Sequence, residues 1–217
     1  MPAPSDRTTV KRRRERGVYE REVVHAVLDE ALVCHLGVIA DGNPVVLPTI
    51  HARVGDVLYV HGAPASRMLR LGRDGDEICV TVTLIDGLVV ARSAFHHSMN
   101  YRSVVVLGRP REVTGDEKVA ALDAIVEHVI PGRSAHTRAP DPGELTGTLV
   151  LALPLDEASA KVRTGPPIDD EADHDLDHWA GVLPLRVVAG DPEPDPRLRP
   201  GIAVPAHVSE WARPSSS

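Results

Sequence analysis

The residues whose types and spacing could do chemistry gather near Arg67, where a predicted strand gives way to a predicted helix. His61 and Gly62 leave the strand, and Pro64 suits the first position of the helix that follows. Ser66 and Arg67 then stand in the first helical turn. Because unpaired backbone N–H groups and the helix dipole favour negative charge there, this turn is a candidate phosphate cradle. Arg67 would give phosphate a bidentate contact, and Ser66 would donate its hydroxyl hydrogen.

Two histidines accompany this candidate cradle. His61 lies where the chain turns towards the anion site, and a histidine of ordinary pKa exchanges protons near neutral pH. We predict that His61 is a catalytic residue, as an acid, a base or a substrate contact, and the alternative is a histidine that only hydrogen-bonds a bound cofactor. His51 lies earlier, on a facing strand, and is the second candidate for the same pocket. The alternative for Arg67 is an ordinary surface arginine on a short helix.

The other histidine pairs do not favour a metal site. His96 and His97 are adjacent, and adjacent strand residues point to opposite faces. His174 and His178 have helical spacing, but they lie in an acidic run that is typical of a solvated helix. We therefore predict no bound metal, while the role of His96 and His97 stays open.

The elements that must position these residues are antiparallel strands. Helical spacing of apolar residues spans 18–32, and a strand is expected at 34–40. The Asp41-Gly42 pair predicts a tight hairpin turn into a strand rich in β-branched residues over 44–53. Gly55-Asp56 predicts a second turn, into a strand at 57–60. Because strands joined by tight turns must be antiparallel, a Rossmann sheet is excluded.

The rest of the chain continues this pattern. Further strands are expected at 77–84, 88–91, 101–107 with a continuation over 109–113, 148–153, 160–163 and from Trp179, and helices at 66–71 and 118–130. The sum is a mainly β (α+β) fold, a small antiparallel β-barrel with peripheral helices. Side chains fill the interior of a barrel of this size, so a bulky cofactor would bind outside it or at a subunit boundary.

Composition and charge bound the class of protein. We predict a flexible N-terminal arm over 1–17, a central domain over 18–188 and a proline-rich tail over 189–217. The formal charge of −7 argues against a nucleic-acid-binding protein, and no apolar run is long enough for a transmembrane helix. Cys34 and Cys79 fit buried free thiols. The cytoplasm is the expected location.

Four motifs resemble the pyridoxamine 5′-phosphate oxidase-like, FMN-binding split-barrel superfamily, and within it the nitroimidazole-resistance group of flavin-nucleotide-binding proteins. In order, they are Gly42-x-Pro44-x-Val46-x-Pro48, Leu58-Tyr59-x-His61-Gly62-Ala63-x-x-Ser66-Arg67, Asn100-Tyr101-Arg102-Ser103-Val104-Val105-Val106-x-Gly108 and His178-Trp179-Ala180-Gly181-Val182-Leu183-Pro184-Leu185. The resemblance covers residues 18–188 and rests on the order and spacing of all four.

The resemblance implies an antiparallel split β-barrel that forms a homodimer with FMN at its interface. One strand would lie along the flavin ring, the segment from His61 would hold the phosphate, and Asn100 to Arg102 would contribute from the partner subunit. Trp179 would cover the ring or fill the barrel mouth. The predicted cofactor contacts are Val46, Leu47, Pro48, Thr49, Ile50, His61, Gly62, Ser66, Arg67, Asn100, Tyr101, Arg102 and Trp179.

The function that follows is an FMN-dependent oxidoreductase, in which NAD(P)H reduces the flavin and a small acceptor, such as a nitro compound or a quinone, takes the electrons. No G-x-G-x-x-G fingerprint occurs, so NAD(P)H would bind only transiently. Two alternatives remain open because a fold does not fix a function. One is a flavin carrier or sensor without turnover, and the other is a heme-binding or deazaflavin-binding relative on the same barrel.

Overall fold

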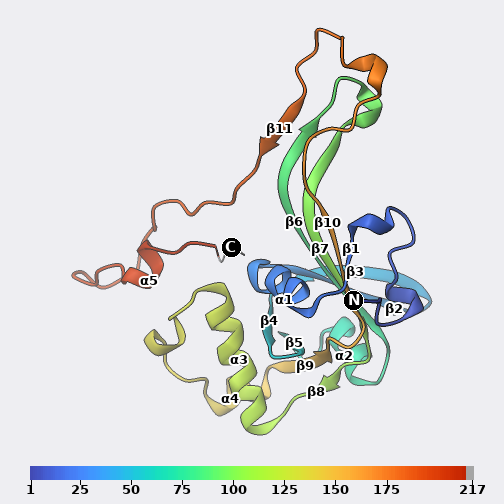
Figure 1. Ribbon diagram of the computed structural model, residues 1–217. Helices are drawn as coiled ribbons and strands as arrows, with labels where there is room; N and C mark the ends of the chain where they lie inside the picture. The colour runs from blue at the N-terminus through green and yellow to red at the C-terminus, as the bar shows by residue number, and fades with distance from the viewer. Residues whose placement is uncertain (214–217) are drawn as a thin grey trace.

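Two antiparallel sheets form the body of the computed structural model, which describes residues 1–213 (Figure 1). Over these residues the larger sheet has seven strands, in the order β1-β10-β7-β6-β2-β3 with β11 paired to β6, and the smaller sheet has four, in the order β4-β5-β9-β8. The strands are β1 (Gly17–Val18), β2 (Cys34–Ala40), β3 (Asn43–Thr49), β4 (His51–Val54), β5 (Val57–Gly62), β6 (Ile78–Val90), β7 (Ser98–Gly108), β8 (Arg111–Glu112), β9 (Leu149–Pro154), β10 (Ala158–Arg163) and β11 (Gly181–Pro184). The helices are α1 (Arg21–Glu30), α2 (Arg67–Arg73), α3 (Gly115–Val129), α4 (Pro142–Thr146) and α5 (Ala206–Ser209). The predicted antiparallel split β-barrel with peripheral helices is confirmed.

The first hairpin forms as the sequence predicts. Strand β2 has the expected bounds, and the turn that follows holds Asp41 at φ 53° and Gly42 at φ 76°. Both residues therefore adopt the left-handed backbone that a two-residue hairpin turn requires. The next expected strand, 44–53, is wrong as a single element because the chain breaks near Ile50. It gives β3 to the larger sheet and β4 to the smaller one, so this break is the point where the chain passes between sheets.

A second difference concerns Asp86-Gly87, which the sequence marks as a turn between two strands. The structure instead runs β6 straight through this pair, with a register shift between Ile85 and Gly87. A Cβ atom at Gly87 would lie 3.0 Å from the carbonyl oxygen of Leu183 on β11. The glycine therefore allows a close approach of β11 and does not make a turn.

The core lies between the two sheets. Residues of β5 and β9 alternate between this core and a smaller cluster beneath α3, as the period of a strand requires. Leu58 and Val60 face the main core, whereas Tyr59 faces α3. Helices α1 and α2 close the main core with Leu28 and Leu69 among others. Burial of each such side chain stabilises the fold by roughly 1.5–3 kcal/mol.

Two histidines close the C-terminal end of α1. The last carbonyl groups of a helix have no partner within it, and α1 has no glycine cap. His51 donates a hydrogen bond from Nε2 to the carbonyl oxygen of Leu28 at 2.9 Å, and His128 donates one to Ala31 at 2.7 Å. The two rings lie 4.8 Å apart between centroids. Burial, followed by the neighbouring His128, lowers the pKa of His51 to about 4. His51, predicted as a second pocket histidine, therefore lies in the interior.

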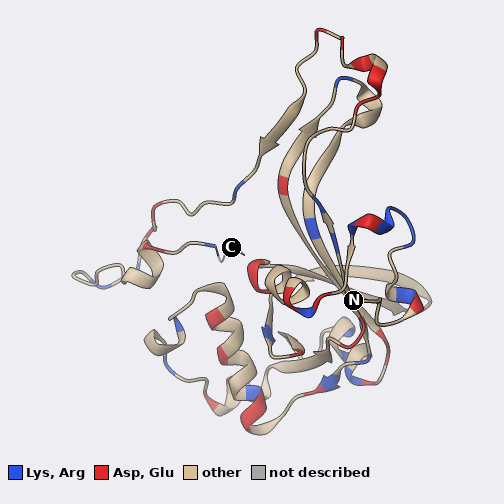
Figure 2. Cartoon of the chain, viewed as in Figure 1, with Lys and Arg blue, Asp and Glu red and all other residues tan. Residues whose placement is uncertain are grey.

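Strands β6 and β7 extend beyond the barrel as a long arm, and β11 pairs along it (Figure 1). Charged side chains are sparse along these strands (Figure 2). Exposed apolar side chains line the arm, namely Ile85, Phe95, Met99, Trp179 and Leu183. Among the described residues, no helix has the length and apolar character needed to cross a membrane.

The N-terminal segment contacts the barrel, and the C-terminal segment meets the ends of α3 and α1 through Trp211 and Arg213. Residues 1–17, for which the sequence predicts a flexible arm, include η1 (Asp6–Thr8) and η2 (Arg14–Arg16). Arg7 pairs with Glu157 and Glu77, and the backbone N–H of Val10 donates to the hydroxyl of Tyr19 at 2.8 Å. The predicted proline-rich tail lacks strands over 189–213 and contains only α5, while 214–217 lie outside the described residues.

The buried His51 predicts a pH-dependent stability. Because its pKa falls from the ordinary 6.5 to about 4 on folding, the unfolded chain takes up a proton first as the pH decreases. The stabilisation is complete above pH 6.5 and is lost as the pH falls towards 4, by up to about 1.4 kcal/mol per pH unit for this single proton. We expect His51→Gln to flatten the pH dependence of the unfolding free energy in this range, measured by urea titration. The exposed His174→Gln should keep the wild-type slope, and an unchanged slope in His51→Gln would contradict the assignment.

Candidate functional site

A cavity of about 900 Å³ opens at the end of β5, and His61 lines it. Helix α3 forms one wall, and the segment from Ser134 to Thr148 forms the other. The α3 wall is mostly apolar, with Val119, Ala120, Leu122, Ile125 and Val126, and it also contributes Asp116 and Asp123. This volume lies in the range typical of small-molecule and cofactor sites.

The alternation of β5 places His61 in this cavity. Tyr59 and His61 are two residues apart and therefore share one face of the strand, the face that α3 covers. The hydroxyl of Tyr59 donates to Glu117 of α3 at 2.9 Å, which holds the helix above the strand. Residue Val60 between them faces the main core. A shift of β5 by one residue would bury the imidazole in the barrel.

The imidazole of His61 is half-buried, and its Nδ1 atom is fully buried without a hydrogen-bond partner in residues 1–213. Burial lowers the pKa of His61 below its ordinary value, so the ring is neutral at pH 7. A buried polar atom without a partner is costly unless a ligand or water satisfies it. A neutral imidazole beside an apolar wall is therefore available as a metal ligand or a hydrogen-bonding group for a bound cofactor.

The far rim of the cavity is polar. Arg138 donates from Nη1 to Glu144 at 2.7 Å, and the two side chains form an ion pair. The Arg138 guanidinium lowers the pKa of Glu144 to about 2. Ser134 and Thr137 lie on the same side. This rim could hold the carboxylates of a ligand whose apolar body lies against α3.

The predicted phosphate cradle lies elsewhere. Ser66 is the N-cap of α2 and makes no side-chain capping bond, while Arg67 is the first residue of the helix. Arg67 is exposed and donates from Nη1 to Asp41 at 3.1 Å, in the turn between β2 and β3. A Cβ atom at Gly62 would lie 2.9 Å from the Cδ1 atom of Leu69, so the chain passes close to α2 at this point. The fold thus brings Arg67 to the β2–β3 hairpin but not to the cavity that His61 lines.

The predicted flavin-ring residues Val46, Leu47, Pro48, Thr49 and Ile50 are also outside this cavity. Strand β3 is an edge of the larger sheet, and within the described residues it pairs only with β2. Val46 is 60% exposed, which is high for an apolar strand residue. An exposed apolar edge offers backbone groups and apolar contact to a flat ligand.

The other predicted cofactor contacts lie on β7 and on the arm, and they are distant from β3 because β6 and β2 separate β7 from β3 in the sheet. On β7, Arg102 pairs with Glu30 and Asp86, and these contacts raise its pKa. Asn100 contacts the buried Arg163, Tyr101 is half-buried, and Trp179 is exposed on the arm. One chain does not bring these residues to β3 or Arg67. Their cofactor contacts stay predictions.

Sequence reasoning missed the walls of the His61 cavity. The sequence predicts the helix over 118–130, but Val119 and Val126 lie outside its buried stripe and remain exposed. Apolar residues on this second face of the helix were the feature of the sequence that could have predicted the wall of a ligand-binding cavity. The described residues hold no group of three or more His, Cys, Asp and Glu side chains suited to a metal ion. Cys34 and Cys79 are free, as predicted.

Comparison with solved structures found two extensive similarities. A flavocytochrome from Azotobacter vinelandii is 42% identical, with a TM-score of 0.91, and the match covers 98% of this chain and 99% of that chain. An FAD- and heme-binding protein from Mycobacterium smegmatis is 38% identical, with a TM-score of 0.87, over 90% of this chain and 96% of that chain. A 5-nitroimidazole resistance protein from Bacteroides thetaiotaomicron, at 24% identity and a TM-score of 0.56, covers 67% of this chain and 86% of that chain and shares the fold.

A comparison with curated proteins gave no match. The model of the pyridoxamine 5′-phosphate oxidase family matches residues 20–162, about two thirds of the chain and nearly all of the barrel. The resemblance inferred from the four motifs is thereby confirmed. This chain belongs to the pyridoxamine 5′-phosphate oxidase family.

Proposed function

We propose that this protein is a redox protein that binds both a flavin and a heme. The observation that carries the proposal is the neutral, half-buried imidazole of His61, without a hydrogen-bond partner in the described chain, in an apolar cavity of about 900 Å³. Two relatives support it, because the flavocytochrome and the FAD- and heme-binding protein are 42% and 38% identical over almost the whole chain.

The cavity fits a heme in three respects. Histidine is a common axial ligand of heme iron, and it must be neutral to coordinate. The apolar wall of α3 suits a flat macrocycle, and Val119 and Val126 are exposed where such a ring would cover them. Arg138, Ser134 and Thr137 lie across from this wall and could bind propionate carboxylates. His61 would then hold the iron, in place of the acid–base role that the sequence predicts.

The flavin would bind along β3, with its phosphate at Arg67. Support comes from the exposed apolar edge of β3 and from the contact between Arg67 and the β2–β3 turn. The sequence predicts FMN. We propose FAD instead, since the similar protein from Mycobacterium smegmatis binds FAD together with heme. A flavin supplies hydride and single-electron chemistry, and a heme supplies single-electron chemistry.

We further propose that the protein is an oxidoreductase that takes electrons from NAD(P)H and delivers them to a small acceptor. The apolar side chains of the α3 wall would limit the access of water to the heme edge, although Asp116 and Asp123 of the same helix also line the cavity. A flavin carrier or sensor, and a protein that uses deazaflavin, are the alternatives. A carrier would leave its flavin oxidised in the presence of NAD(P)H.

The arm favours a homodimer as the working unit. Its exposed apolar side chains and the exposed edge of β3 lie on the same seven-stranded sheet. In a dimer, the arm of the partner subunit would cover β3, and Asn100, Tyr101, Arg102 and Trp179 would reach the flavin of the opposite chain. This arrangement would bring together the predicted flavin contacts, which lie far apart within one chain.

Replacement of His61 tests the heme assignment. We expect the full-length wild-type protein, expressed with heme supplied, to show a Soret band, and His61→Ala to lose most of it because the iron loses its axial ligand. The flavin absorbance should persist, since β3 and Arg67 are unchanged. The exposed His174→Ala serves as the matched control and should keep the band. A full Soret band in a folded His61→Ala protein would contradict the proposal.

Replacement of Arg67 tests the flavin phosphate site. Loss of a charge-assisted hydrogen bond should weaken flavin binding by about 1.5–3 kcal/mol, or about tenfold to 150-fold in Kd. The dissociation constant can be measured by fluorescence during flavin titration of Arg67→Ala. Arg70→Ala, on the same helix, removes an equal charge that the cradle does not use. Equal affinities in the two variants would show that the cradle is misplaced.

A charge placed on the arm tests the dimer. Leu183 on β11 lies across β6 from Met99, and both are exposed in the single chain. Sedimentation should show a dimer for the wild type at micromolar concentration and a monomer for Leu183→Asp, because a buried carboxylate without a partner opposes association. Ile202→Asp, in the C-terminal segment, should remain dimeric. A wild-type monomer that retains its flavin would rule out the shared site.

A further inference from the structure

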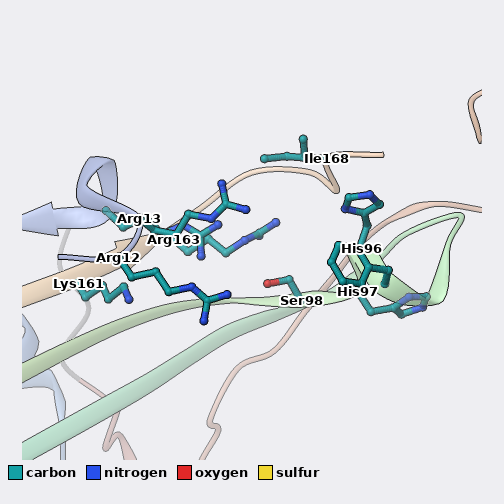
Figure 3. Close-up of a pocket in the computed structure, with 10 residues that line it drawn as sticks. Arg12, Arg13, His96, His97, Ser98, Lys161, Arg163 and Ile168 are labelled. Carbon is teal, nitrogen blue, oxygen red and sulfur yellow. The ribbon is translucent and has the colours of Figure 1, made fainter. Parts of the chain in front are cut away.

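A second cavity, of about 430 Å³, lies between the N-terminal segment and the outer end of the arm, where β6 connects to β7 (Figure 3). Its walls come from η2 and the residues before it, from the end of β10, and from η3 (Ala94–His96) with the start of β7. Five of its lining residues are cationic, namely Arg12, Arg13, Arg16, Lys161 and Arg163. Figure 3 shows Arg12, Arg13 and Arg163 extending from one wall, with Ser98 and His96 opposite.

These cations lack counter-charges. No carboxylate lines the cavity, although the chain as a whole carries a formal charge of −7. Within residues 1–213, Arg12, Arg13, Lys161 and Arg163 form no ion pair, and Arg16 meets Glu15 only at 4.0 Å. Like charges held this close repel one another, so the cavity attracts anions.

Arg163 is the strongest sign of a built site. Arg163 is only 6% exposed. Within the described chain its guanidinium nevertheless contacts only neutral groups, namely the Asn100 side chain and the carbonyl oxygens of Gly165 and Pro166. Burial, and then the nearby charge of Arg16, lowers the pKa of Arg163. A buried, uncompensated charge is costly, and a bound anion would remove that cost.

The rim of the cavity suggests which anion binds. Phe95 is 89% exposed, an unusual position for the single phenylalanine of the chain. It packs edge-on against His96, with ring centroids 5.2 Å apart. An exposed aromatic ring beside several arginines is the combination that binds nucleotides, through base stacking and phosphate contacts.

We propose that this basic cavity binds the adenosine phosphate part of a dinucleotide. The inference rests on the proposed function, because FAD and NAD(P)H are its two sources of that group. The pyrophosphate lies among Arg12, Arg13 and Arg163, and Phe95 stacks on the adenine. Where the source is FAD, the cavity is that of the partner subunit, whose arm would cover β3, so that one pyrophosphate meets both Arg67 and these arginines. The cavity volume suits a ligand of this size.

A pair of double variants of the full-length protein tests the proposal. Arg12→Gln/Arg13→Gln removes two cations that line the cavity, whereas Lys11→Gln/Arg14→Gln removes two from the same basic run that do not line it. Each protein is analysed for the FAD it retains on purification and for its affinity for ADP and NADPH by calorimetry. We expect the cavity variant, but not the control, to show a loss of about tenfold or more, the size of one charge-assisted contact.

The two sources give different results. Loss of retained FAD identifies the flavin as the ligand, whereas weaker ADP and NADPH binding with FAD retained identifies the electron donor. Unchanged FAD content and unchanged ADP and NADPH affinity would overturn the proposal, as would equal losses in the two double variants. The Soret band of the same preparations reports separately on the heme site at His61, so a failure here is distinguishable from a failure of the proposed function.

Discussion

The structure depends on the position of one strand, β5, between two apolar layers. Alternate residues of β5 face the barrel core and the cluster beneath α3, so the strand cannot shift register without burying His61 or exposing Leu58 and Val60. The contact between Tyr59 and Glu117 holds α3 at the distance that leaves the cavity open. The candidate heme ligand is thus positioned by the same hydrophobic pattern that stabilises the fold.

Side chains rather than a glycine cap connect the C-terminal end of α1 to this frame. His51 and His128 bind carbonyl oxygens at the end of α1, and both come from elements that pack on the smaller sheet. Arg102 joins the base of the arm to Glu30, at the end of the same helix, and to Asp86 on β6. The end of α1 is therefore the place where barrel, arm and α3 meet, which relates the stability of the barrel to the orientation of the arm.

The sequence predicted local structure well where one turn or one periodicity decides it. Asp41-Gly42 and the strand that precedes it formed as expected. The break near Ile50 was missed because the residues on both sides have the same strand-forming composition. The two segments differ only in the sheet that each joins, which the local sequence does not show. Asp86-Gly87 was predicted as a turn because this pair of residue types is common in turns. The structure has a glycine there because β11, far along the chain, approaches the backbone closely. For the same reason the sequence indicated His61 without its cavity, and it did not connect Arg12 with Arg163. Both sites join segments that meet only in the folded chain.

The central claim is that one fold holds a flavin on its larger sheet and a heme beneath α3. The most direct measurement is the iron and flavin content of the full-length protein, purified after expression with heme supplied and expressed per chain. One heme iron and one flavin per chain are predicted. Flavin without heme iron, in a protein that also fails to take up added heme, would contradict the claim.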